Sequence, residues 1–156
     1  MSSTEPQTSP RTLPPNYTLH TCHPPIQDYL DLRQNTGLTP KTFEQADKAL
    51  AGSWYTIHLT YTDRSKEQKH VVAQARVIGD GGWYFHIVDV AVLPAHQRKG
   101  LADFMMEHLI QKIEDDAPGR PYINLVADPP ANKLYARHGF VDTSTVGRKG
   151  VGMQRY

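Results

Sequence analysis

The amino-acid sequence predicts an α+β fold, an α/β sandwich in which helices flank a mixed, mostly antiparallel central sheet. Three observations support this. Apolar residues alternate over 54–61, which is the period of a half-buried strand, and 70–78 and 83–92 are rich in β-forming residues. The period then changes to three and four residues over 101–116, which indicates an amphipathic helix. Strand and helix patterns alternate after that, so the order favours a sandwich over a doubly wound parallel sheet.

Two short helices are expected before the three strands. A strand over 17–20 comes first, followed by a helix over 26–32 that begins after a Pro-Pro pair. A second helix is expected over 43–50, with Thr39 as its N-cap and Gly52 as its terminator.

The remaining elements follow from the same signals. The connection 79–82 contains three glycines, which suit a tight turn between two strands. After the helix over 101–116 we expect a compact strand over 122–127 and a helix through 131–135 that Gly139 ends. Two last strands are predicted from the patterns of 140–146 and 151–156.

The length of 156 residues corresponds to one domain. Residues 1–16 contain four prolines among serines and threonines, which predicts a flexible arm rather than a signal peptide. The single domain is therefore expected over 17–156. Exposed strand edges in so small a domain make a homodimer a reasonable expectation.

Charge and cysteine content exclude several classes of protein. A formal net charge of +1 gives no bulk attraction for nucleic acid or for an anionic membrane, and no apolar run is long enough to span a bilayer. The single cysteine, Cys22, favours a cytoplasmic protein without internal disulfides. The run His20-Thr21-Cys22-His23 lacks a spaced fourth ligand, so we interpret it as a loop and expect no metal.

The segment 90–102 runs from a buried strand through a basic turn into the amphipathic helix. Free N–H groups in the first helical turn, the helix dipole and the missing side chain of Gly100 together allow a pyrophosphate to approach the backbone. Arg98 and Lys99 add positive charge there. On physical grounds alone, an ordinary packed strand-to-helix connection remains an equally good interpretation.

Gln97-Arg98-Lys99-Gly100-Leu101-Ala102 matches Q/R-x-x-G-x-G/A, and Ala131-Asn132-Lys133-Leu134-Tyr135-Ala136-Arg137-His138-Gly139-Phe140 matches A-x-x-L-Y-x-x-x-G-F. With these two elements in this order, the chain resembles the GNAT superfamily of acetyl-CoA-dependent N-acetyltransferases. The resemblance begins near Val72, and the N-terminal third is only compatible with it. A GNAT-like sheet and helices are therefore expected.

The resemblance implies that acetyl-CoA is the cosubstrate. The strand residues Val90, Ala91 and Val92 would pair with the pantetheine arm, and the turn and helix start would hold the pyrophosphate through Gln97, Arg98, Lys99, Gly100, Leu101, Ala102 and Asp103. Many family members carry Asn seven residues before the tyrosine. Here that residue is Asp128, and Asn132 is nearby but offset, so the polar contact on this side of the coenzyme departs from the family pattern.

Acetyl transfer to an amine requires a base and an acid. A lysine-like amine has a pKa of about 10.4, so it must lose a proton before it attacks a thioester. By resemblance, Tyr135 is the acid that protonates the departing thiolate. His86 occupies the position where several members carry Glu and where arylalkylamine N-acetyltransferases carry His, and imidazole titrates near neutral pH. Asp89 is the rival base. The alternative for His86 and for Tyr135 is a purely structural role as a packed side chain.

The sequence therefore predicts an N-acetyltransferase that moves the acetyl group of acetyl-CoA directly to a primary amine. A small-molecule acceptor, such as an arylalkylamine or a polyamine, suits a small free-standing domain. Three alternatives stay open: an enzyme that acts on protein amines, a non-catalytic module that senses acyl-CoA, and an interaction domain whose basic turn meets an acidic partner.

Overall fold

The computed structural model describes residues 9–156, so residues 1–8 of the predicted arm lie outside the described residues. Its sheet has five strands in the order β1-β2-β3-β4-β5. The first four pair antiparallel and β5 pairs parallel to β4, which confirms the predicted mixed sheet flanked by helices. The strands are β1 (Tyr17–His20), β2 (Tyr55–Asp63), β3 (Gln68–Gly79), β4 (Tyr84–Val92) and β5 (Tyr122–Asn124). The helices are α1 (Ile26–Asn35), α2 (Phe43–Ala51), α3 (Leu101–Asp116) and α4 (Asn132–Arg137), with 3-10 turns at Pro94–His96 and Thr143–Thr145.

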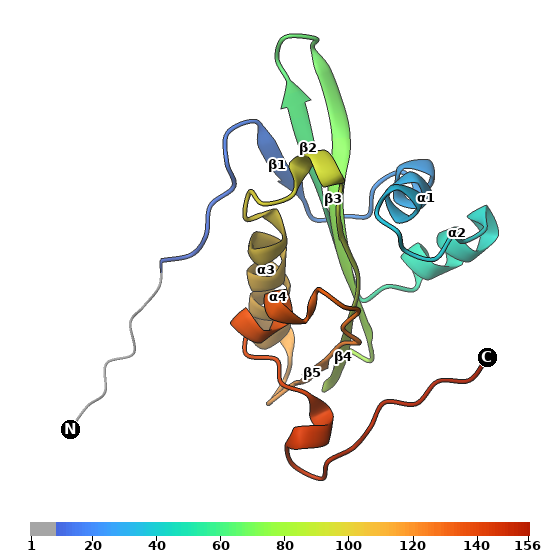
Figure 1. Cartoon of the computed structure of the whole chain (residues 1–156), viewed down its shortest axis with the longest axis vertical. Helices are drawn as coiled ribbons and strands as arrows, with labels where there is room; N and C mark the ends of the chain where they lie inside the picture. The colour runs from blue at the N-terminus through green and yellow to red at the C-terminus, as the bar shows by residue number, and fades with distance from the viewer. Residues whose placement is uncertain (1–8) are drawn as a thin grey trace.

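Helices cover both faces of the sheet, with α1 and α2 on one side and α3 and α4 on the other (Figure 1). The main core lies between the sheet and α3, whose apolar stripe is fully buried. Phe85 of β4 and Leu109 of α3 are both 0% exposed in this core. This packing follows from the helical period of 101–116, and it fixes where α3 begins relative to β4.

On the other face, a smaller core of Tyr29, Ala46 and Leu50 joins α1 to α2. The second helix begins at Phe43 as predicted, but Thr42 rather than Thr39 is its N-cap. Thr42 and Gln45 form a capping box, in which each side chain accepts a hydrogen bond from the other residue's backbone N–H. Gly52 ends this helix as predicted.

The prediction of two last strands was wrong. Residues 140–146 contain the 3-10 turn Thr143–Thr145, and 151–156 adopt neither helix nor strand. The Asp142 side chain accepts the Ser144 N–H at 2.8 Å, which starts the turn at a point where a strand would need extended backbone. The preceding strand, β5, is also shorter than the predicted segment 122–127.

Residues 9–16 of the predicted arm form neither helix nor strand, yet several of them contact the domain. Leu13 packs against the main core, and Arg11 Nε lies 2.7 Å from Glu107 Oε1 of α3. This part of the segment therefore follows the surface of α3.

Candidate active site

The turn between β4 and α3 has a backbone shape that suits an anion. Arg98 and Gly100 both have positive φ, 59° and 78°, and a Cβ built on Gly100 would meet nothing within 4 Å. The Gln97 side chain donates to Val92 O at 3.0 Å and so braces the turn from within. Left-handed residues at alternate positions direct successive N–H groups toward one point, which is the geometry of an anion-binding nest.

The start of α3 adds further donors to this turn. The first helical hydrogen bond runs from Phe104 N to Gly100 O, so the N–H groups of the residues between them have no intrahelical acceptor. They lie at the positive end of a helix of 16 residues. These groups, with Arg98 beside them, fit the pyrophosphate of a coenzyme A molecule.

A cleft of about 570 Å³ opens beside this turn. One wall is the end of β4, the floor is the turn and the first residues of α3, and the other wall is α4. Its lining consists of Val90, Ala91, Val92, His96, Gln97, Arg98, Gly100, Leu101, Ala102, Asp103, Pro130, Ala131, Lys133, Leu134, Tyr135 and Arg137. We call this space the cofactor cleft. Two separate sequence motifs, one ending near 103 and the other beginning near 131, thus form one concave surface.

Most of the predicted cofactor residues lie in this cleft, but three do not. Lys99, Asp128 and Asn132 are absent from its lining. Asp128 instead accepts the Ala131 N–H on its carbonyl oxygen at 2.8 Å, just before α4. Asn132 lines a neighbouring cleft on the far side of Tyr135. On this wall, Lys133 and Arg137 supply the polar groups.

Sequence reasoning did not single out Lys133 and Arg137 as cofactor-cleft residues. They stand four positions apart in one short helix, the spacing that places two side chains on the same face. With Arg98 they give the cleft a positive lining, although the net charge of the whole chain is only +1. The four-residue spacing of Lys133 and Arg137 is the sequence signal that could have identified them as residues of the cofactor cleft.

The cofactor cleft exists because β4 and β5 pair over only part of their length. Their parallel pairing runs from Tyr84 opposite Tyr122 to His86 opposite Asn124, and β4 then continues without β5 as far as Val92. The free edge of β4 leaves backbone groups available to a ligand in the cleft. The predicted base, His86, therefore lies at the last paired position, where the two strands separate.

His86 is half-buried and its Nδ1 is hydrogen-bonded to Asn124 Oδ1. The Asn124 amide nitrogen donates to Phe85 O at 3.3 Å, so its oxygen faces the imidazole. Nδ1 must then carry the proton, and the neutral ring keeps the lone pair of Nε2 as its acceptor. His86 does not line the cofactor cleft.

Tyr135 lies between two clefts. It lines the cofactor cleft and also a second cleft of about 660 Å³, formed by β5, α4 and residues 139–146. Within residues 9–156 its hydroxyl makes no hydrogen bond, so it is free to donate to a ligand. Burial raises the pKa of Tyr135, and the negative charge of Asp128 raises it further. The phenol therefore stays protonated at neutral pH.

Asp89, the rival base, is engaged with other side chains. Its carboxylate accepts hydrogen bonds from Tyr29, Arg33 and Arg76, each at 2.6 Å. Burial raises the pKa of Asp89, but the hydrogen bonds from Tyr29 and Arg76 and the charges of both arginines outweigh it, so the pKa lies below its ordinary value. A carboxylate in this state is a weak proton acceptor.

Within residues 9–156, no three side chains of His, Cys, Asp or Glu are grouped in a way that could hold a metal ion. In the same part of the chain, no helix has the length and apolar character needed to cross a membrane.

Comparison with known proteins identifies the family of the chain. Residues 42–156 match the family model "Acetyltransferase (GNAT) domain", and the chain belongs to that family. It is similar to a solved structure from meticillin-resistant Staphylococcus aureus, a protein of unknown function described as a "Probable Acetyltransferase". The two chains are 36% identical with a TM-score of 0.77 over 90% of this chain and 98% of the other.

Two curated relatives were also found. An uncharacterized N-acetyltransferase of Gracilaria tenuistipitata var. liui is 27% identical over 126 residues, which are 81% of this chain and 66% of the relative. A histone acetyltransferase of Glycine max is 29% identical over 102 residues, which are 65% of this chain and 43% of the relative. The chain thus spans less than two thirds of the length of either.

Proposed function

We propose that the protein is an acetyl-CoA-dependent N-acetyltransferase that acts on a small primary amine. The observation that carries the proposal is the cofactor cleft, which combines a free strand edge, a left-handed basic turn and a helix N-terminus. Acetyl-CoA bound there would supply an acetyl group activated as a thioester. A direct transfer needs only a site for the amine beside the thioester, a base and an acid.

Tyr135 is the acid in this proposal. It reaches the cofactor cleft from α4, opposite Val90–Val92, and its pKa above the ordinary value keeps it protonated. As the carbon–nitrogen bond forms and the carbon–sulfur bond breaks, the Tyr135 hydroxyl donates to the departing sulfur. The absence of another partner for this hydroxyl within residues 9–156 supports the role.

His86 is the base. Its hydrogen bond to Asn124 orients the ring and leaves Nε2 as acceptor. Because His86 lines neither cleft, it takes the proton of the amine through a water molecule. Asn124 lines the second cleft, so the imidazole stands one hydrogen bond behind that surface.

The second cleft supports a small acceptor. Its volume of about 660 Å³ lies in the range of small-ligand sites, and its lining is largely apolar with one carboxylate, Asp142. Hydrogen bonds from Ser144 lower the pKa of Asp142, so this carboxylate stays charged and can attract an ammonium group. An amine with an apolar body suits such a surface.

The test is a thiol-release screen of acetyl-CoA against aromatic amines, polyamines, amino acids and short peptides. Wild-type turnover should fall by about 100-fold or more in Tyr135→Phe, the scale of a lost general acid. Tyr84→Phe is the matched control, because Tyr84 lies on β4 and is 44% exposed, outside both clefts. Equal turnover by wild type and Tyr135→Phe would contradict the assignment of the acid.

A module that binds acyl-CoA without turnover is the second candidate. Two features favour it: Asp128 replaces the usual asparagine, and its charge makes Tyr135 a weaker acid. Acetyl-CoA binding by calorimetry together with no thiol release for any amine in the screen would select this candidate. Release with the peptides alone would instead select a protein acceptor.

A further inference from the structure

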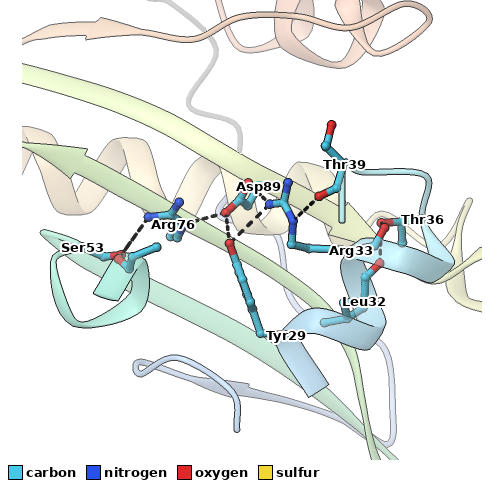
Figure 2. A network of polar contacts seen from close by, with 9 residues as sticks. Tyr29, Leu32, Arg33, Thr36, Thr39, Ser53, Arg76 and Asp89 are labelled. Carbon is cyan, nitrogen blue, oxygen red and sulfur yellow. Dashed lines mark hydrogen bonds and ion pairs between the residues drawn. The ribbon is translucent and has the colours of Figure 1, made fainter. Parts of the chain in front are cut away.

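Three donors from two separate elements converge on one carboxylate of β4 (Figure 2). Arg33 Nη1 of α1 donates to Asp89 Oδ1, while Tyr29 OH of α1 and Arg76 Nε of β3 donate to Oδ2, all at 2.6 Å. The side chains of Arg33, Arg76 and Asp89 are only 8%, 14% and 12% exposed. We call this group the Asp89 clamp.

The clamp holds an unusual piece of backbone. Asp89 has φ of 56°, in the left-handed region that a residue with a side chain rarely adopts. The register with β3 shifts at the same place, because Gln74 pairs with Ala91 whereas Arg76 pairs with Val88. Two residues of β4 therefore stand opposite Ala75 alone, which is a β-bulge.

The bulge separates the two functional parts of β4. His86 lies before it, at the end of the pairing with β5. Val90 is part of it and Ala91 and Val92 follow it, and all three line the cofactor cleft. A change in φ at Asp89 would rotate the backbone groups of Val90–Val92 relative to the turn. The conformation of Asp89 thus determines how the backbone groups at the free edge of β4 are oriented in the cofactor cleft.

The two arginines that bind Asp89 also contact the segments that flank α2. Arg33 Nε donates to Thr39 O at 2.8 Å, in the connection between α1 and α2, and Arg76 Nη1 donates to Ser53 Oγ at 3.1 Å, just after α2 (Figure 2). Both arginines are therefore held independently of Asp89, which makes them fixed points for the bulge.

We propose that Asp89 is a positioning residue rather than the base. Clamped by Tyr29, Arg33 and Arg76, it locks the bulge of β4 and so presents Val90–Val92 to acetyl-CoA. This inference rests on the proposed function for the identity of the ligand only. The geometry of the clamp does not depend on it.

The experiment compares Asp89→Asn with the wild type in two measurements. Calorimetry should show acetyl-CoA binding weakened by about 10-fold to 100-fold, the scale of a displaced binding surface. Amide hydrogen exchange should be faster over 88–92 and unchanged in α3. Glu44→Gln is the matched control, because it makes the same carboxylate-to-amide change in an exposed ion pair on α2.

Tyr29→Phe is the second variant, for use if Asp89→Asn fails to fold. It removes the hydrogen bond from Tyr29 to Asp89 and the weaker one from Arg33 to Tyr29, and it keeps the ring packed against Ala46 and Leu50. It should move both measurements in the same direction by a smaller factor. In either variant the pH profile of kcat/KM should keep its wild-type shape, since a positioning residue takes no proton from the amine.

Unchanged exchange over 88–92 together with unchanged acetyl-CoA binding would overturn the proposal. A lost pH-dependent limb in Asp89→Asn with normal binding would also overturn it and make Asp89 the base. If the wild type itself does not bind acetyl-CoA, the proposed function fails, and the exchange comparison alone still decides whether the clamp holds the bulge.

Discussion

His138 Nε2 lies 2.8 Å from Asp103 Oδ1, and this contact joins the end of α4 to the first turn of α3. Arg137 adds a second contact, with its Nη2 at 3.1 Å from Asp103 Oδ2. Tyr135 precedes these two residues in the chain, so the Asp103 carboxylate fixes the wall that carries the proposed acid. The backbone N–H of Asp103 remains available to phosphate, while its side chain is committed to α4.

Asp103→Ala should therefore reduce kcat as well as acetyl-CoA affinity. Loss of both contacts releases α4, and a displacement of Tyr135 by about 1 Å can cost about 100-fold in rate. Asp103→Asn should retain more activity because its amide oxygen still accepts a hydrogen bond. Steady-state kinetics of the two variants provide the measurement, and equal kcat in Asp103→Ala and wild type would show that this contact does not position Tyr135.

The pH profile tests His86. We expect kcat/KM of the wild type to fall as the pH falls, because a protonated base cannot accept the proton of the amine, and His86→Gln to remove this dependence. Asn124→Asp keeps an oxygen against Nδ1 and should retain the pH dependence, moved toward higher pH because the added negative charge favours the imidazolium. A wild-type profile in His86→Gln would remove His86 from the mechanism.

Acid stability tests the charge state of Asp89. Its pKa is lower in the folded protein than in the unfolded chain, so the stabilisation is fully present above about pH 3.9 and is lost as the pH falls toward the folded pKa. At pH 7, Asp89→Asn should lower the free energy of unfolding by about 3 kcal/mol, the cost of breaking a buried ion pair. Urea unfolding at a series of pH values should show this difference shrinking below pH 3.9 or so. A difference that is constant with pH would contradict the assignment.

Helix α3 covers the main hydrophobic core, and its contribution to stability can be tested at Leu109. Leu109 is 0% exposed between this helix and the sheet, and Leu109→Ala should lower the free energy of unfolding by about 2–5 kcal/mol. Val126, which is 74% exposed, is the control, and its change to alanine should stay within about 0.5 kcal/mol. Similar losses in both variants would mean that α3 does not cover the core.

The sequence predicted the parts of the fold that depend on local periodicity. Strands β2, β3 and β4 and helix α3 have long apolar patterns of one period, and each appears within about two residues of its predicted bounds. The last two strands failed because β-branched residues alone do not supply a partner strand. The Asp142 turn and the glycines at 147, 150 and 152 compete with extended backbone there.

In the candidate site, too, local features could be predicted from the sequence and contacts between distant residues could not. The turn at Arg98–Gly100 was predicted because its residues are contiguous and its chemistry is local. The Asp89 clamp and the contact between Asp103 and His138 were not predicted. Except for the bond from Arg76 to Asp89, their contacts join residues at least 35 positions apart in the sequence. Only the packed fold brings such groups together.

The most direct measurement is an acetyl-CoA titration by calorimetry of wild type, Gly100→Glu and Gly37→Glu. Both glycines have positive φ, 78° and 80°, and open space at Cβ, so the two variants carry the same backbone strain. Only Gly100 lies in the cofactor cleft, where the added carboxylate would meet the pyrophosphate. We expect binding by wild type and Gly37→Glu and no binding by folded Gly100→Glu. Wild-type affinity in Gly100→Glu would contradict this expectation.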